Sequence, residues 1–235
     1  MIVLTGDTHR EFERIFEFCE EYDLTRDDVL VILGDAGINY CLDESDEALK
    51  WELSQLDVTL LCVHGNHEER PSEIPSYEEV EWNGGLVYVE PEYPNLLFAK
   101  DGEIYSLGCR TAMAIGGAYS IDKYYRLANR LPWFESEQPD ETIKAFVEAQ
   151  LDRAGWQMDY IFSHAAPLQW EPRHAFIPGL SQSQVDKSTE RWLDEILRRM
   201  LRCDGWFCGH YHIDDQMGPV RILFNDFLEL DTEED

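Results

Sequence analysis

Short apolar runs alternate with amphipathic stretches through the first third of the chain. Val29–Leu33 is wholly apolar, which is typical of a strand buried on both faces, whereas Glu11–Tyr22 repeats its apolar residues at helical spacing. This strand–helix alternation favours a largely parallel sheet covered by helices. Strands are predicted at Ile2–Thr5, Val29–Leu33 and Val58–His64, and helices at Glu11–Tyr22 and Asp43–Gln55.

The middle of the chain has a different pattern. Four short apolar runs follow one another, separated by proline or glycine turns such as Asp101-Gly102. We expect an antiparallel meander that forms a second sheet. Its strands are predicted at Leu86–Val89, Leu96–Lys100, Glu103–Leu107 and Thr111–Ile115.

The second half returns to alternating helices and strands, interrupted by two long loops. Residues 116–138 form a loop rich in aromatic and charged side chains, residues 164–179 form another, and 229–235 are an acidic tail. The chain has no internal repeat and no linker, so we expect one domain over residues 1–235. Helices are predicted at Glu141–Ala154 and Gln184–Leu201, and strands at Tyr160–Ser163, Trp206–Cys208 and Val220–Phe224.

The charge balance is strongly acidic. Lysine and arginine number 19 against 48 aspartates and glutamates, which gives a net charge of −29. Such a surface repels nucleic acid and anionic lipid, so long duplex nucleic acid is not an expected partner. An anionic substrate would need a local positive centre, which a metal ion or a group of arginines can provide.

The composition also bears on location. No apolar run approaches the length of a membrane span of about 20 residues, and the first residues lack the basic segment of a signal peptide. The six cysteines are scattered without C-x-x-C spacing, so we expect buried, reduced thiols. These features predict a cytoplasmic protein without a membrane partner, and they do not indicate its oligomeric state.

Polar clusters follow five of the predicted strands at their C-terminal ends. Ligands of α/β sheets collect at the carboxyl ends of strands, so all five clusters can meet at one sheet edge. Residues two apart in an extended chain share a face, and the mixture of carboxylate, imidazole and amide suits Mn²⁺, Fe or Zn²⁺. The clusters are Gly6-Asp7-Thr8-His9, Gly34-Asp35, Gly65-Asn66-His67-Glu68, His164 and Gly209-His210-Tyr211-His212.

In this order, the motifs Asp-x-His, Gly-Asp, Gly-Asn-His-Glu, a single His and Gly-His-x-His resemble those of the calcineurin-like metallophosphoesterases. The resemblance covers positions 7 to 212 and implies an α/β fold, a four-layer α/β/β/α sandwich with two mixed sheets. It also implies a dinuclear metal site in which Asp35 bridges the two ions. One ion would be held by Asp7, His9, Asp35 and His212, and the other by Asp35, Asn66, His164 and His210.

The activity implied by the resemblance is metal-dependent hydrolysis of a phosphomonoester or a small phosphodiester. A hydroxide that bridges two ions about 3.5–4 Å apart would attack phosphorus in line. His67 matches the family histidine that stabilises or protonates the leaving oxygen. Manganese is the expected metal, with iron or zinc as alternatives, and the expected substrate is a phosphorylated small molecule or a nucleotide.

The chain departs from the motifs of one branch of the family at the residues that bind the substrate. In the phosphoprotein phosphatases the second motif continues as Gly-Asp-x-x-Asp-Arg, but this chain has Ile38 and Asn39 in place of the last two residues. The residues that would orient His67 and hold phosphate are therefore missing, which argues against protein phosphatase activity. Candidate replacements in substrate binding are Arg70, Lys123 and Arg126; the last two lie in the 116–138 loop, a candidate lid whose aromatic residues could stack on a base.

Two other classes of function stay open. The chain could be a non-catalytic regulatory or binding module that keeps the metallophosphoesterase fold, or an acidic decoy that mimics nucleic acid. All seven ligand positions are filled, which favours the enzyme. Phosphomonoesters, cyclic or small phosphodiesters and short nucleic acids all remain as substrate classes.

Overall fold

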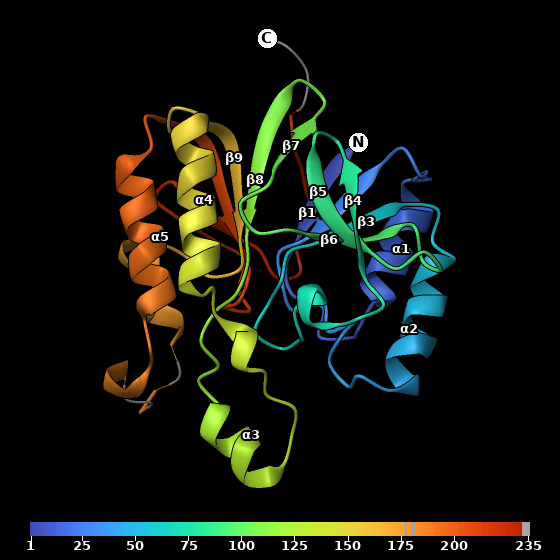
Figure 1. Ribbon diagram of the computed structural model, residues 1–235, viewed down its shortest axis with the longest axis horizontal. Coiled ribbons are helices and arrows are strands. Elements are labelled where there is room, and N and C mark those ends of the chain that lie inside the picture. Colours follow the sequence, from blue (N-terminus) through green and yellow to red (C-terminus); the bar gives the residue numbers. More distant parts are fainter. Residues whose placement is uncertain (177, 180–181, 232–235) are drawn as a thin grey trace.

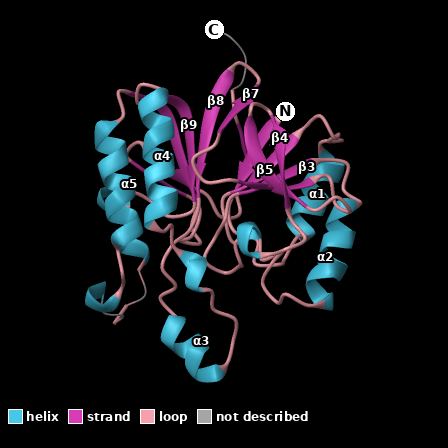
Figure 2. Ribbon diagram, viewed as in Figure 1, coloured by secondary structure: helices cyan, strands magenta, loops and turns pink. Residues whose placement is uncertain are grey.

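Two β-sheets packed face to face form the centre of the computed structural model, which describes residues 1–176, 178–179 and 182–231. Apolar side chains from both sheets, such as Leu4 and Val31 from one and Ala112 and Phe162 from the other, fill the space between them. A pair of helices covers the outer face of each sheet (Figures 1 and 2). The layers are therefore helix, sheet, sheet and helix, as the resemblance implies.

The first sheet has seven strands in the order β13-β1-β2-β3-β6-β5-β4. Its four central strands are parallel, and β4, β5 and β13 pair antiparallel. Helices α1 (Glu13–Glu21) and α2 (Glu44–Ser54) cover it, burying Ile15 and Leu53 against the strands. The strands are β1 (Ile2–Thr5), β2 (Val29–Ile32), β3 (Thr59–Cys62), β4 (Glu78–Trp82), β5 (Gly85–Val89), β6 (Leu96–Ala99) and β13 (Leu228–Glu229).

The second sheet has six strands in the order β11-β12-β10-β9-β8-β7. Strands β8, β9, β10 and β12 are parallel, and β7 and β11 form antiparallel edges. Helices α4 (Glu141–Arg153) and α5 (Ser188–Arg199) cover its outer face. The strands are β7 (Ile104–Leu107), β8 (Arg110–Ile115), β9 (Gln157–Ser163), β10 (Arg202–Cys208), β11 (Asp215–Met217) and β12 (Val220–Ile222).

The predicted antiparallel meander is wrong in one respect. Strands β5 and β6 belong to the first sheet and β7 and β8 to the second, so the chain crosses between the sheets at Asp101-Gly102. Leu97 of β6 and Leu107 of β7 both enter the core between the sheets. The same alternating pattern serves hairpin partners and strands that face each other across a sandwich, which is why the sequence did not separate them.

Several smaller elements also differ from expectation. Residues 116–138, predicted as a loop, contain helix α3 (Lys123–Asn129), which stands off the sheet edge in Figure 1. Helix α5 begins at Ser188, four residues later than predicted, and the strands β4, β11 and β13 were not predicted. Part of the predicted acidic tail is ordered, because Glu229 pairs with β1 and Leu230 is buried; residues 232–235 lie outside the described part.

All six cysteines are free, as expected, but only Cys62 and Cys208 are buried. Cys19 and Cys203 are partly buried, and Cys41 and Cys109 are exposed, so the prediction of buried thiols is wrong for these four. Within the described residues, no helix combines the length and the apolar character needed to cross a membrane.

Candidate metal centre and catalytic site

The loops after β1, β2, β3, β9 and β10 meet at one edge of the two sheets, the edge that faces α3 in Figure 1. They carry the five polar clusters predicted from the sequence. Three groups of side chains there place potential metal-ligand atoms within 4.8 Å of one another. The groups are Asp7 with His9 and His212, His9 with Asp35 and His67, and Asp7 with Asp35 and His164.

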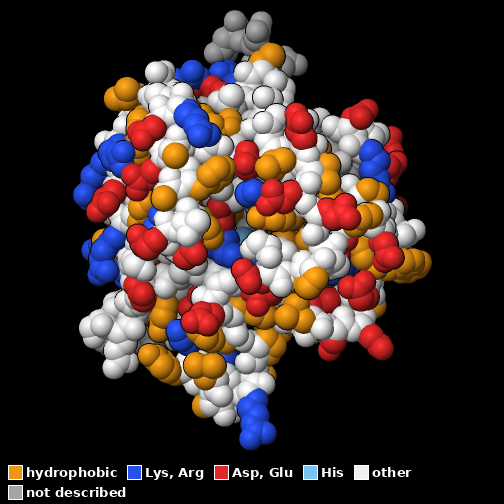
Figure 3. All heavy atoms as spheres, in the orientation of Figure 1, with side chains coloured by type: hydrophobic (Ala, Val, Ile, Leu, Met, Phe, Trp, Pro, Cys, Tyr) orange, Lys and Arg blue, Asp and Glu red, His pale blue; other side chains and the backbone are white. Residues whose placement is uncertain are grey.

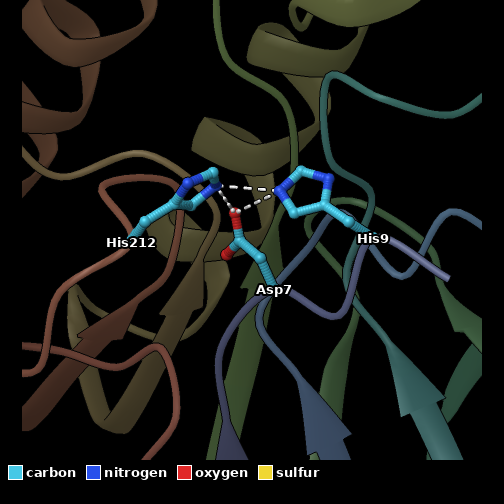
Figure 4. A group of neighbouring side chains, drawn as sticks. All are labelled: Asp7, His9 and His212. Carbon is cyan, nitrogen blue, oxygen red and sulfur yellow. Dashed lines mark hydrogen bonds and ion pairs between the residues drawn. The ribbon is translucent and has the colours of Figure 1, made fainter. Parts of the chain in front are cut away.

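The first group is shown in Figure 4. Asp7 Oδ2 lies 3.2 Å from His212 Nε2 and 3.6 Å from His9 Nε2, and the two imidazole nitrogens are 2.8 Å apart. These atoms come from the loop after β1 and the loop after β10. A buried carboxylate oxygen between two imidazole nitrogens is a donor set that suits a divalent cation, so these side chains fit the metal implied by the resemblance.

Asp35 lies between this group and the second predicted set. Its Oδ2 is 3.8 Å from His9 Nε2 and 3.6 Å from His164 Nε2. His164 Nε2 is also 2.9 Å from Asn66 Oδ1, and the His210 ring packs edge-on against it with centroids 4.9 Å apart. Asp35 therefore lies close to histidines of both predicted sets, and Asp7 also comes within 4.8 Å of His164.

Backbone groups fix the orientation of these ligands. The His67 N–H donates to Asp35 Oδ1 at 2.7 Å, which leaves Oδ2 facing the histidines. His164 Nδ1 lies 2.8 Å from the carbonyl oxygen of Leu33. Because a carbonyl only accepts, Nδ1 carries the hydrogen, and Nε2 of the neutral ring keeps its lone pair for a metal.

Glycines let the loops approach closely. A Cβ added to Gly65 would lie 2.0 Å from Asp35 Oδ1, and one added to Gly209 would lie 2.3 Å from Asp7 Oδ1. The carboxylates occupy the space that a side chain would need. Five of the ten described non-glycine residues with positive φ lie in the same loops, at a cost of about 1 kcal/mol or more each. They are His9, Arg10, Asp35, His210 and His212.

The buried acids and histidines of this cluster shift one another's pKa values. Burial raises the pKa of Asp7 and of Asp35, but neighbouring histidines outweigh it and hold both pKa values below the usual range. Burial lowers the pKa of His210 to about 3, so its ring is neutral. Burial also acts to lower the pKa of His164, but Asp35 and Asp7 raise it to about 9, so this ring must lose a proton before its Nε2 can bind a metal.

His67, the predicted catalytic residue, lies between the ligand loops and α3. Its ring is in contact with the guanidinium of Arg126 and nearly parallel to Tyr40, with centroids 6.4 Å apart. Burial lowers the pKa of His67 to about 4. The charge of Asp35 raises this pKa, and the charge of Arg126 lowers it. The structure therefore places a neutral imidazole beside a buried cation.

The position of Arg126 differs from that expected of an arginine that only binds phosphate. Its side chain is 4% exposed, and its Nε donates to Asp122 Oδ2 at 2.8 Å, one turn earlier. The guanidinium therefore joins an acid of the 116–138 segment to the imidazole of His67. Ile38, which stands where a related phosphatase has an aspartate, is fully buried in the apolar core. Ile38 therefore offers His67 no charged partner, whereas the Asp122–Arg126 pair does.

The other two predicted substrate-binding cations lie elsewhere. Arg70 is buried, pairs with Asp101 and donates to the carbonyl oxygen of Ser136, and it lines a separate cavity of about 260 Å³. Lys123 lies over the Trp133 ring, 3.9 Å from its centroid. Neither side chain lines the cavity that contains Asp35 and His67.

Two supporting residues extend the predicted site. Glu68 accepts hydrogen bonds from the N–H groups of Gly37 and Gly65, both at 3.1 Å, and so ties two ligand loops together, in line with the structural role expected for it. Ser120 was not predicted: its Oγ accepts from Asn66 Nδ2 at 3.0 Å and turns the amide oxygen toward His164. The sequence offered no signal for Ser120 beyond its place in the candidate lid.

A cavity of about 590 Å³ opens beside these residues. Asp35, Asn66, His67, His210 and His212 line one part of it. The rest of its wall comes from the 116–138 segment, the loop that follows β9 and the loop that follows β10. Its size is within the range of small-molecule sites in proteins, which is roughly 300–1,000 Å³.

Comparison with known proteins shows the family to which the chain belongs. Similar solved structures include a phosphopantetheinyl hydrolase from Mycobacterium tuberculosis, with 16% identity, a TM-score of 0.44, and coverage of 95% of this chain and 87% of that one. A putative 5'-nucleotidase from Staphylococcus aureus in complex with alpha-ketoglutarate has 12% identity and a TM-score of 0.38, with 94% of this chain and 38% of that one covered. A search of curated proteins gave no match. A family model described as calcineurin-like phosphoesterase matches residues 1–214, which include every predicted ligand, and the chain belongs to that family.

Proposed function

We propose that this chain is a metal-dependent phosphoesterase that hydrolyses a phosphomonoester or a small phosphodiester at a dinuclear site. The observation that carries the proposal is the position of Asp35, whose Oδ2 lies within 4 Å of His9 on one side and His164 on the other. A carboxylate shared between two ligand sets is what a bridging role requires. The non-catalytic and decoy alternatives do not account for this arrangement.

The proposed ligand sets are those that the family resemblance implies. Asp7, His9 and His212 would hold one ion together with Asp35, and Asn66, His164 and His210 would hold the other with Asp35. Bound divalent ions, of which Mn²⁺ is the first choice and Fe or Zn²⁺ the alternatives, supply an activated water and neutralise the charge of phosphate. They also provide the local positive centre that a chain with a net charge of −29 needs to attract an anion.

The proposed role of His67 is to donate a hydrogen bond to the substrate. Burial keeps the ring neutral, so one of its nitrogens carries a hydrogen that a phosphoryl or leaving oxygen in the adjoining cavity could accept. Arg126 Nη2 contacts both ring nitrogens, and because it only donates, the nitrogen that lacks the hydrogen accepts from it. Arg126 also adds positive charge near the developing negative charge.

The 116–138 segment is proposed to cover the site as a lid. It supplies Arg126 to His67 and Ser120 to Asn66, and it borders the cavity at Ile121. A segment of this kind can exclude water when substrate binds. The predicted stacking on aromatic residues of this segment is not part of the proposal, because Trp133 already packs under Lys123.

Hydrolysis of a simple aryl phosphomonoester and of the matching diester, each with Mn²⁺, tests the proposal. We expect Mn²⁺-dependent turnover of at least one of them. Asparagine keeps the shape of the Asp35 side chain but has one oxygen where the carboxylate has two. The Asp35→Asn variant should therefore lose at least about 100-fold in activity and remain folded. Absence of turnover with both esters, or full activity of Asp35→Asn, would contradict the proposal.

A further inference from the structure

The cavity beside the candidate metal centre has two chemically different parts. The part next to Asp35 and His67 is polar, as described above. The remaining wall is largely apolar and comes from three segments far apart in the sequence. Its apolar side chains are Ile121 from the start of the lid, Ala175 and Phe176 from the loop after β9, and Tyr211 and Ile213 from the loop after β10.

Tyr211 anchors this apolar wall to the metal centre. It follows the predicted ligand His210, and the two rings pack edge-on with centroids 5.0 Å apart. Its Oη accepts a hydrogen bond from the Ala166 N–H at 3.3 Å, so its polar atom is turned toward the protein. The Phe176 ring lies nearly parallel to it, with an interplanar angle of 16° and a centroid distance of 6.4 Å. The wall therefore begins directly beside the predicted site of hydrolysis.

The cavity offers no second grip for an anion. Among the described residues that line it, Lys187 is the only lysine or arginine. Its Nζ is already bound to Glu171 at 2.6 Å and to Glu190 at 3.2 Å. The one carboxylate outside the ligand set, Asp122, is paired with Arg126. A substrate group with its own charge would find no free partner here.

We infer that this apolar part of the cavity binds the organic portion of the phosphoester, and that this portion carries a flat, uncharged ring such as a nucleobase. The inference rests on the proposed function. A phosphate group alone would leave most of the roughly 590 Å³ empty, and the apolar side chains of Ile121, Phe176 and Tyr211 line the part that remains. Gln182, also at the cavity, provides an amide that can bond to the edge of a heterocycle.

Competition between two ligands that share one phosphate ester tests the inference. Adenosine 5'-monophosphate and ribose 5-phosphate carry the same primary phosphate and differ in the base. Their inhibition constants against aryl phosphoester hydrolysis by the Mn²⁺-loaded enzyme compare them whether or not they are themselves hydrolysed. We expect the nucleotide to bind at least about tenfold more tightly, because only it fills the apolar wall. Equal inhibition constants would overturn the inference and leave the proposed function intact.

Two variants locate the effect. Ile213→Ala and Phe176→Ala should each weaken inhibition by the nucleotide several-fold and leave ribose 5-phosphate unchanged. Leu201→Ala removes an aliphatic side chain of similar size that is 79% exposed outside this cavity, and it should change neither constant. Loss of binding for both ligands alike, or no change for either, would contradict the assignment of the wall. Absence of any aryl ester hydrolysis would instead overturn the proposed function, and this inference with it.

Discussion

The ligand cluster and the lid are held to the molecule in different ways. The predicted metal ligands directly follow buried strands. Backbone N–H groups and closely packed glycines fix the positions of their carboxylates. The lid stands outside the sheets and is joined to the site through side chains, chiefly Arg126 and Ser120. Its helix exposes Tyr124, Tyr125 and Leu127, and Figure 3 shows apolar side chains gathered at that end of the visible face. The cluster is thus built by the fold, whereas the lid is attached to it.

The difference explains where the cations of this chain lie. The chain has 48 acidic residues and only 19 basic ones, so an arginine or lysine side chain pairs with a carboxylate and is then not available to bind a substrate. Arg10 pairs with Asp46, and Arg70 pairs with Asp101. Figure 3 shows acidic and basic side chains interspersed over the surface. Under the proposed function, the positive charge that attracts an anionic substrate would come from bound metal ions and from Arg126, whose guanidinium contacts His67.

The largest effect is expected inside the cluster. Gly65→Ala would place a Cβ 2.0 Å from Asp35 Oδ1, and the bridging carboxylate would have to move. We expect activity to fall by at least about 100-fold, since displacing a ligand costs more than removing its outer support. Gly155→Ala is the control: its added Cβ meets nothing closer than 3.9 Å, so any loss there comes from the strain of an alanine at a φ of +61° and not from a displaced neighbour. Turnover by Gly65→Ala equal to that of the control would break the argument that backbone packing fixes the cluster.

A smaller loss is expected where the lid meets the cluster. Arg126→Met removes the cation beside His67, and we expect kcat to fall roughly tenfold to a hundredfold, as for other residues that position a catalytic group. Arg130→Met, which removes an exposed cation from the end of the same helix, should have no such effect. Separate measurement of kcat and KM sharpens the comparison: a rise in KM with unchanged kcat would show that Arg126 grips phosphate instead of positioning His67.

Removing the second link should act on the metal. Ser120→Ala deletes the acceptor that orients the Asn66 amide, so we expect the Mn²⁺ concentration for half-maximal activity to rise about tenfold. Ser106→Ala, on the exposed face of β7, is the matched control. If both variants are activated at the same Mn²⁺ concentration, the lid does not support the second ligand set.

The smallest effect is expected within the lid itself. Lys123→Met should leave KM within about twofold, because the ammonium packs on Trp133 and does not line the cavity. The loss of this cation–π contact should lower the free energy of unfolding by about 0.5–1 kcal/mol, measured by thermal denaturation. A tenfold rise in KM would return Lys123 to the substrate-binding role that the sequence suggested.

The same contrast separates what the sequence could predict from what it could not. Glycine-flanked polar motifs after apolar strands indicated which ligands meet, because the carboxyl ends of parallel strands share an edge. Arg70 pairs with Asp101, which is distant in the sequence, and no local pattern encodes that choice. Asp122 and Arg126 are four residues apart, a spacing that indicates a pair only once the segment is known to be helical. The short α3 leaves too little periodicity to distinguish a helix from a loop. The separation of β6 and β7 into two sheets escaped prediction because alternation does not specify the sheet to which a strand belongs.

The metal content of the purified chain tests the central claim most directly. The protein would be loaded with Mn²⁺, separated from free ions by gel filtration and analysed for manganese per chain, beside Asp35→Asn. A bridging carboxylate in a dinuclear centre predicts about two ions in the parent chain and at most about one in the variant. A content near zero in the parent chain, or the same content in both proteins, would contradict the account.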